Sequence, residues 1–221
     1  MTFAVIKLSY NKIGESNVEG GICGAGFFID NKTFVTANHI FNAIKNMPNP
    51  GCTNCQYCLI SRNGEIIEVI NATILEYPGI DTTVIKFHSK VTEDIVRIDR
   101  SLPKIGDKIC NQGFISNMPQ INAEWGLKGL IIKSANLNSS ISDASGIVRE
   151  SKKDTVNAND VKILNKTIIV TSYPGNVGMS GGPMFNEKNL VVGLMSIGLP
   201  PDVTQKDFLG AIWIDEILKT V

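Results

Sequence analysis

Three short segments carry residue types that together can break an amide or ester bond. Ser180 lies in a run of glycines, His39 follows the apolar segment Thr33–Ala37, and Asp81 precedes the apolar segment Thr82–Phe87. A serine hydroxyl is a weak nucleophile at neutral pH, so it needs a base that takes its proton, and imidazole suits that task. A carboxylate can fix the tautomer of that imidazole. The sequence therefore predicts Ser180 as nucleophile, His39 as general base and Asp81 as its orienting partner.

The glycines around Ser180 predict a second part of the site. They let the backbone turn tightly and come close to a substrate. They also leave the amides of Gly178 and Ser180 free to point at one oxygen atom. We therefore expect these two amides to form an oxyanion hole.

Each of these residues also has a purely structural interpretation. Ser180 would then belong to a glycine-rich turn, His39 would be a hydrogen-bonded polar group near a strand end, and Asp81 would cap the preceding turn. The other histidine, His88, trails an apolar run and is expected to be a solvated surface residue.

The same segments carry a family resemblance. Val-Thr-Ala-Asn-His (35–39), Ile-Asp-Thr-Thr-Val-Ile (80–85) and Gly-Met-Ser-Gly-Gly-Pro (178–183) resemble, in the same order, the motifs of the chymotrypsin-like (trypsin-fold) serine peptidases. Segment 191–198 is similar to the strand of that family that lines the specificity pocket and pairs with substrate. The resemblance implies a serine endopeptidase that cleaves a protein or peptide substrate through an acyl-enzyme.

The resemblance also implies a fold and a set of substrate-binding residues. The fold would be all-β, with two antiparallel six-stranded β-barrels, the triad between them and a C-terminal helix. Tyr173, Ser196, Ile197 and Gly198 would bind the substrate. The chain is most similar to bacterial members with a single catalytic domain. Met179 replaces the acidic residue that pairs with a freed amino terminus in digestive members, so we expect no such activation.

The distribution of apolar runs agrees with an all-β chain. Short β-branched runs are interrupted by Gly, Asn and Pro, as is typical of barrels and sandwiches. The N-terminus is expected to form a first strand, and the further expected strands are 22–29, 33–37, 65–76, 82–87, 108–115, 129–133, 161–171, 183–185, 190–197 and 208–212.

Other segments predict how these strands are connected. Helical spacing of apolar residues predicts a helix over 212–221. The polar segment 94–106 predicts a crossing between an N-terminal barrel, residues 1–100, and a C-terminal barrel, residues 101–221. The polar segment 135–160 is expected to be mostly exposed loop, with a short strand at 146–149.

A cysteine cluster is the one feature that the family pattern leaves unexplained. Cys52, Cys55 and Cys58 have a spacing that can hold zinc or an iron-sulfur cluster, with Cys23 or Cys110 as a fourth ligand. Three ordinary loop cysteines and a redox-sensing role are the alternatives. We expect no cofactor and keep the metal site as an alternative.

Composition excludes several classes of protein. Lys and Arg number 21 and Asp and Glu number 21, so the chain lacks the positive charge that nucleic acid binding requires. No apolar run approaches the roughly 20 residues needed to cross a bilayer. The five cysteines are an odd number and the first residues do not resemble a secretory signal, so we expect a reducing, cytoplasmic location.

Two other functions stay open at this stage. A peptidase fold can be a binding module, or it can be an enzyme that is gated by a regulatory partner or a fused region. The same triad also cleaves esters, although the expected pairing strand at Ser196 to Gly198 suits an extended peptide better.

Overall fold

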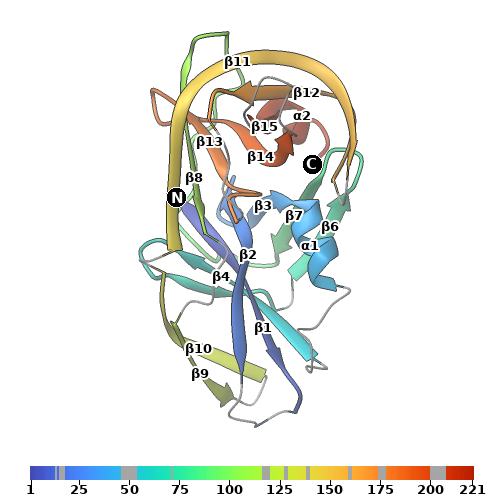
Figure 1. Ribbon diagram of the computed structural model, residues 1–221. Coiled ribbons are helices and arrows are strands. Elements are labelled where there is room, and N and C mark those ends of the chain that lie inside the picture. The colour runs from blue at the N-terminus through green and yellow to red at the C-terminus, as the bar shows by residue number, and fades with distance from the viewer. Residues whose placement is uncertain are drawn as a thin grey trace.

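The computed structural model describes residues 1–12, 14, 18–45, 54–70, 72–115, 120–126, 129–137, 140–158, 161–173, 178–199 and 208–221. The chain forms two β-rich lobes, one below the other in Figure 1. The expected all-β class and the short C-terminal helix are confirmed. In the described part of the chain, no helix has the length and apolar character to span a membrane.

The N-terminal lobe is one antiparallel sheet of seven strands in the order β5-β4-β1-β2-β3-β7-β6. The six-stranded barrel expected here is thus, in its hydrogen-bonded order, a sheet with two edges. Its elements are β1 (Thr2–Tyr10), β2 (Glu19–Phe28), β3 (Thr33–Ala37), α1 (Asn38–Lys45), β4 (Asn54–Ser61), β5 (Ile66–Glu68), β6 (Ala72–Tyr77) and β7 (Thr82–Phe87).

The C-terminal lobe contains a closed barrel of six strands in the order β11-β12-β15-β14-β13-β8, as expected. Closure leaves no unpaired barrel edge. Its elements are β8 (Lys108–Phe114), β11 (Ile141–Ala158), β12 (Val161–Thr171), β13 (Pro183–Asn186), β14 (Val191–Leu199), β15 (Phe208–Trp213) and α2 (Ile214–Leu218).

A separate hairpin follows β8 and packs on the other lobe. It consists of β9 (Gln120–Gly126) and β10 (Gly129–Asn136). Leu130 and Ile132 pack in one apolar cluster with Ala4 and Ile6 of β1. The Gln56 side chain fixes the hairpin because its amide donates to the Leu130 carbonyl at 2.8 Å and accepts from the Leu130 amide at 3.2 Å. These contacts cover one face of β1, which is why nearly all of β1 is buried.

Three strand boundaries were predicted correctly and others were not. The structure confirms 33–37, 82–87 and 161–171 to the residue, whereas the expected strand 65–76 is divided into β5 and β6. The prediction of a mostly exposed loop over 135–160 is wrong, because β11 is a strand of 18 residues. Buried or half-buried positions alternate with exposed ones along its first half, so its outer face has the composition of a loop.

The two lobes share one apolar core. Phe27, Val35 and Val84 of the N-terminal lobe pack in a cluster with Ile163 and Ile217 of the C-terminal lobe. All five are buried. The described segment between β7 and β8 contributes Val96 to the same cluster.

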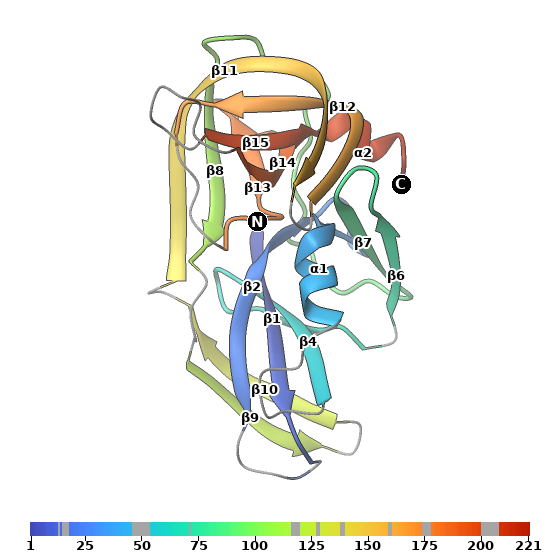
Figure 2. The same ribbon diagram turned by 45° about the vertical axis from the view of Figure 1, so that its right-hand side comes forward.

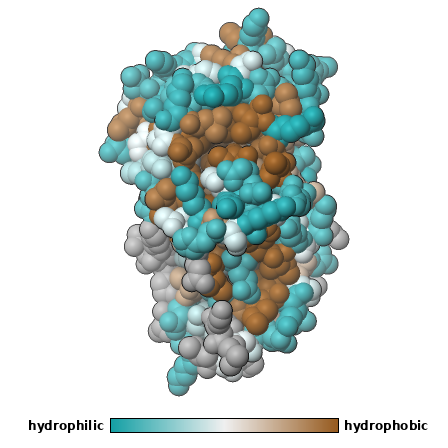
Figure 3. Space-filling view, turned by 180° about the vertical axis from the view of Figure 1, so that it is seen from behind, coloured by the Kyte–Doolittle hydropathy of each residue, from teal (hydrophilic) through white to brown (hydrophobic). Residues whose placement is uncertain are grey.

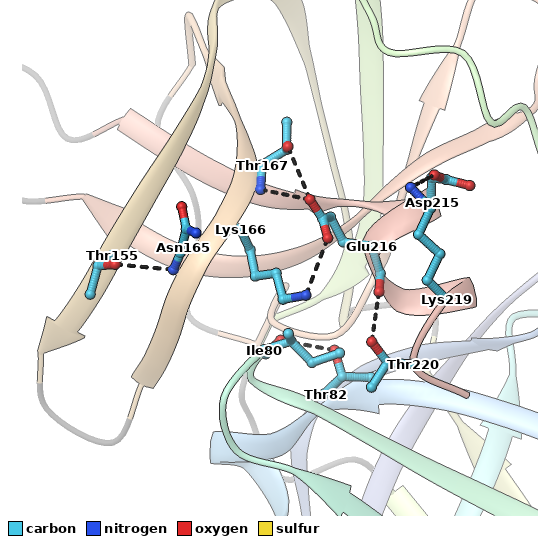
Figure 4. A network of polar contacts seen from close by, with 10 residues as sticks. All are labelled: Ile80, Thr82, Thr155, Asn165, Lys166, Thr167, Asp215, Glu216, Lys219 and Thr220. Carbon is cyan, nitrogen blue, oxygen red and sulfur yellow. Dashed lines mark hydrogen bonds and ion pairs between the residues drawn. The ribbon is translucent and has the colours of Figure 1, made fainter.

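Helix α2 is fastened to β12 by one carboxylate, shown in Figure 4. Glu216 accepts from the Thr167 amide at 3.3 Å, from the Thr167 hydroxyl at 3.1 Å and from the Lys166 ammonium at 3.2 Å. Partial burial acts to raise the pKa of the Glu216 carboxyl, but the hydrogen bonds from Lys166 and Thr167 outweigh it and lower the pKa.

Because the pKa of Glu216 is lowered, the stabilisation from its hydrogen bonds to β12 depends on pH. The Glu216 contribution to stability is complete above the ordinary carboxyl pKa of about 4.3 and is lost as pH falls through the lowered value. We expect Glu216→Gln to lower the free energy of unfolding by about 1 kcal/mol at pH 7. The gap between variant and wild type should close as pH falls below about 4.

Urea unfolding at a series of pH values measures this effect. Glu187→Gln serves as a matched control because Glu187 is exposed and, among the described residues, forms an ion pair with the exposed Lys108 alone. It should change the free energy of unfolding by less than about 0.5 kcal/mol. A gap that stayed constant at acidic pH would contradict the assignment to Glu216.

Candidate active site

A buried carboxylate and an imidazole form the centre of the site. Asp81 is 1% exposed and lies in the turn between β6 and β7. Its Oδ2 atom is 2.8 Å from His39 Nδ1, and its Oδ1 atom accepts from the His39 backbone amide at 2.9 Å. An imidazole held through Nδ1 presents Nε2 away from the carboxylate, which is the orientation that a general base needs.

The local chain conformation explains why these two residues meet. β3 and β7 pair in register up to Ala37 and Thr82, so the residues that follow one strand and precede the other are neighbours. Asp81 has a φ of +43°, a conformation that Asp tolerates better than most residues. Its backbone carbonyl accepts from the Asn38 amide at 2.9 Å.

Helix α1 was not predicted, and it positions the imidazole. His39 is its second residue, so an amide that would lack a partner inside the helix donates to the Asp81 carboxylate instead. The negative charge also lies at the positive end of the helix dipole. The Asn38 side chain accepts from the Thr83 hydroxyl at 2.9 Å, which ties the helix start to β7.

Ser196 joins this pair from the other lobe. Its hydroxyl, in β14, donates to Asp81 Oδ2, and the residue is buried. Sequence analysis assigned Ser196 to substrate binding, and its contact with Asp81 was missed. A single serine in a strand gives no local signal for a partner far away in the sequence.

Ser180 lies against the N-terminal lobe on the same side as His39. Its carbonyl accepts from the Ala25 amide at 2.8 Å. A Cβ on Gly24 would overlap Ile40, the residue after His39, and would approach the Ser180 carbonyl to 2.9 Å. Among the described residues, no hydrogen bond joins the side chains of Ser180 and His39. Such contacts often tighten only when substrate binds.

The backbone amides next to Ser180 divide into two groups. The amide of Gly181 donates to the Met195 carbonyl at 2.7 Å, and the amide of Gly182 donates to the Met179 carbonyl at 3.0 Å. Within the described segments, the amides of Gly178 and Ser180 donate to no residue. Gly178 has a φ of +100°, which favours glycine there. Two free amides are therefore present where the oxyanion hole was expected.

The residues expected to bind substrate have different environments. Ile197 and Gly198 pair with Gly210 and Leu209 of β15, and β13 pairs with β14 only at 191–194. The other backbone edge of β14 at these two residues is thus free of strand pairing in the described chain. Tyr173 differs, because it is buried in the barrel core and its hydroxyl donates to Asn111. Its side chain is therefore not available for the expected contact with substrate.

The cysteine cluster does not form a shared metal site in the described residues. Cys55 and Cys58 both lie in β4, three positions apart, so their side chains point to opposite faces. Cys58 is buried beside Ile6, and burial raises the pKa of its thiol. Cys55 is 3.4 Å from the Tyr57 hydroxyl. Cys52 lies outside the described residues, and among those described no group of three or more candidate ligands is found.

Comparisons with known proteins agree with this geometry. Residues 24–194 match a family model described as a trypsin-like peptidase domain. No curated protein matches the chain. The active form of the Rv3671c protease from M. tuberculosis is similar with a TM-score of 0.60 and 14% identity, over 98% of this chain and 78% of that chain.

Two further solved structures have the same fold. A serine endoprotease from Yersinia pestis gives a TM-score of 0.58 and 18% identity, over 98% of this chain and 60% of that chain. The HtrA-type protease AlgW with a tripeptide gives a TM-score of 0.62 and 16% identity, over 98% of this chain and 58% of that chain. At these identities the likeness shows the fold alone.

The packing around Gly181 generates a prediction. Gly181 has a φ of +81°, and a Cβ there would overlap the Ala25 carbonyl and the Thr36 hydroxyl. Gly106 has a φ of +91° with open space around it, so Gly106→Ala isolates the backbone strain. We expect Gly106→Ala to lower the free energy of unfolding by about 1–2 kcal/mol. Gly181→Ala should lower it by more than about 4 kcal/mol. Thermal and urea unfolding of both variants measure the difference, and equal losses would show that the close approach at Gly181 is absent.

Proposed function

The chain belongs to the trypsin-like peptidase family, and we propose that it hydrolyses peptide bonds inside protein or peptide substrates through a triad of Ser180, His39 and Asp81. The observation that carries the proposal is the buried Asp81 carboxylate. It is hydrogen-bonded to His39 Nδ1 and to the Ser196 hydroxyl.

The proposed reaction has two halves. Ser180 Oγ attacks the substrate carbonyl carbon while His39 Nε2 takes the hydroxyl proton. The amides of Gly178 and Ser180 donate to the resulting oxyanion. As the C–N bond breaks, His39 returns its proton to the leaving amine, and an acyl-enzyme is left on Ser180. Water then attacks the acyl carbon while His39 takes a proton from it. The bond from the acyl carbon to Ser180 Oγ breaks, His39 returns the proton to Oγ, and the acid product leaves.

The free edge of β14 favours a peptide over a small ester. An extended substrate can add to that edge through main-chain hydrogen bonds at Ile197 and Gly198. A small ester has no backbone to pair in this way. We therefore propose an endopeptidase rather than an esterase.

Control by a partner is the second candidate, and a specific observation favours it. Ser180 and His39 are not hydrogen-bonded to each other in the described chain, so closing this contact is a step that a partner or a substrate can drive. Figure 3 shows apolar areas in the upper and lower parts of the face seen from behind, bordered by hydrophilic side chains. Apolar surface of this kind is typical of interaction sites.

Labelling with a fluorophosphonate tests whether the triad is assembled. We expect intact mass to show one adduct on the wild type and none on Ser180→Ala or His39→Ala. His88→Ala is the matched control and should label fully, because His88 is exposed at the end of β7. A labelled Ser180→Ala protein would contradict the proposed nucleophile, and an unlabelled wild type would favour control by a partner.

The role of Asp81 has its own test. We expect Asp81→Asn to reduce turnover of a peptide substrate by about ten-thousandfold, because the amide would hold the wrong imidazole tautomer. Steady-state kinetics and circular dichroism separate lost catalysis from lost folding. Turnover within tenfold of the wild type would show that Asp81 does not orient the base.

A further inference from the structure

The first part of β12, in the β11–β12 hairpin, touches the turn that carries Asp81. Ile163 forms an isolated antiparallel bridge with Ile80, and the Leu164 amide donates to the Gly79 carbonyl at 2.9 Å. Figures 1 and 2 both show this end of the hairpin beside the turn between β6 and β7. Ile163 is fully buried in the core that the two lobes share. The C-terminal lobe therefore holds the backbone immediately before the carboxylate.

A β-bulge allows the Leu164 amide to reach the Gly79 carbonyl. Asp154 pairs with Lys166 and Val156 pairs with Ile163, so Leu164 and Asn165 together lie opposite Thr155. Asn165 has a φ of +50°, and its amide donates to the Thr155 hydroxyl at 3.0 Å, as Figure 4 shows. Because a bulge takes a residue out of the ladder, the Leu164 amide is released from pairing with β11 and reaches Gly79.

The other side of the bulge is held in place. Lys166 and Thr167 follow it directly, and both donate to the Glu216 carboxylate of α2, also shown in Figure 4. The bulge thus lies between the Asp81 turn and the part of β12 that Glu216 holds. Because contacts hold β12 on both sides of the bulge, a shift in the register of β12 would also move Gly79 and Ile80.

The Asp81 turn has little freedom to absorb such a shift. Asp81 sits at positive φ, its amide donates to the Pro78 carbonyl at 3.3 Å, and its carbonyl accepts from Asn38. Displacing Gly79 therefore rotates or moves the carboxylate that holds His39 Nδ1.

We propose that the β-bulge in the β11–β12 hairpin positions the catalytic aspartate, with Asn165 and Thr155 as positioning residues. The proposal rests on the proposed function for the role of Asp81 in catalysis. It assigns a role in the N-terminal half of the site to a segment of the C-terminal lobe that touches neither Ser180 nor His39.

A pair of substitutions at Asn165 tests the proposal. Asn165→Val disfavours positive φ and should remove the bulge, whereas Asn165→Gly keeps that conformation. Asn165 is exposed, so both variants should fold. We expect Asn165→Val to lower kcat about tenfold to a hundredfold with little change in KM, because the catalytic groups and not the binding edge are displaced. Asn165→Gly should restore kcat to near the wild-type value.

Two further measurements make the result specific. Lys152→Val puts the same side chain on an exposed position of the same hairpin and should leave kcat unchanged. The downfield proton resonance of the His39 Nδ1–H, hydrogen-bonded to Asp81, reports the carboxylate position directly. It should shift or broaden in Asn165→Val and stay in place in Asn165→Gly and Lys152→Val.

The proton resonance also separates the two proposals. A wild type that shows the resonance but neither labels nor cleaves would contradict peptidase activity of the isolated chain and favour control by a partner. The response of the resonance to Asn165→Val would still decide the role of the hairpin. An unchanged resonance and unchanged kcat in a folded Asn165→Val protein would overturn the positioning role. A loss of kcat of the same size in Asn165→Gly would also overturn it, since the bulge is kept there.

Discussion

Burial of the Asp81 carboxylate is the constraint on which the rest of the site depends. A carboxylate that is 1% exposed is tolerated only when donors surround it, because an unpaired buried charge is very unfavourable. Its donors come from α1 through His39 and from β14 through Ser196. His39 supplies a donor to each carboxylate oxygen within the N-terminal lobe, and docking of the C-terminal lobe adds the Ser196 hydroxyl. This last hydrogen bond couples assembly of the site to assembly of the fold.

The apolar core between the lobes makes that docking possible. Val84, two residues after the Thr82 that begins β7, packs with Ile163 and Leu194 in a cluster without exposed members. Burial of apolar surface brings the lobes together without fixing their orientation. The hydrogen bonds of Asp81 then select one position of the lobes relative to each other. Backbone contacts from Asn38 and Leu164 fix the same turn from two sides. Precision at the site thus comes from polar contacts, and most of the attraction comes from the core.

The sequence predicted those parts of the molecule that depend on local chemistry. The three triad candidates and the strands 33–37 and 82–87 follow from residue types and from apolar patterning, and the structure places His39 beside Asp81. Of β11 the sequence predicted only the part at 146–149, because a strand with one solvated face is polar. It did not predict α1, because a helix of eight residues is short. The bond from Ser196 to Asp81 joins residues 115 apart, and no local pattern encodes it.

Unusual backbone conformations gather around the site for a physical reason. Among the residues that the structure describes, Asp81, Asn165 and Asn189 are the non-glycine residues with positive φ. The first two flank the contact from Leu164 to Gly79. Positive φ is unfavourable for side chains that the surroundings do not support, and such strain persists where neighbouring contacts determine it. Here a turn and a bulge, each unfavourable alone, meet through one backbone hydrogen bond. Asn and Asp are the non-glycine residues that tolerate this conformation best, and they occupy both positions. Each lobe therefore contributes one non-glycine residue at positive φ, and the two segments support each other at the turn that carries Asp81.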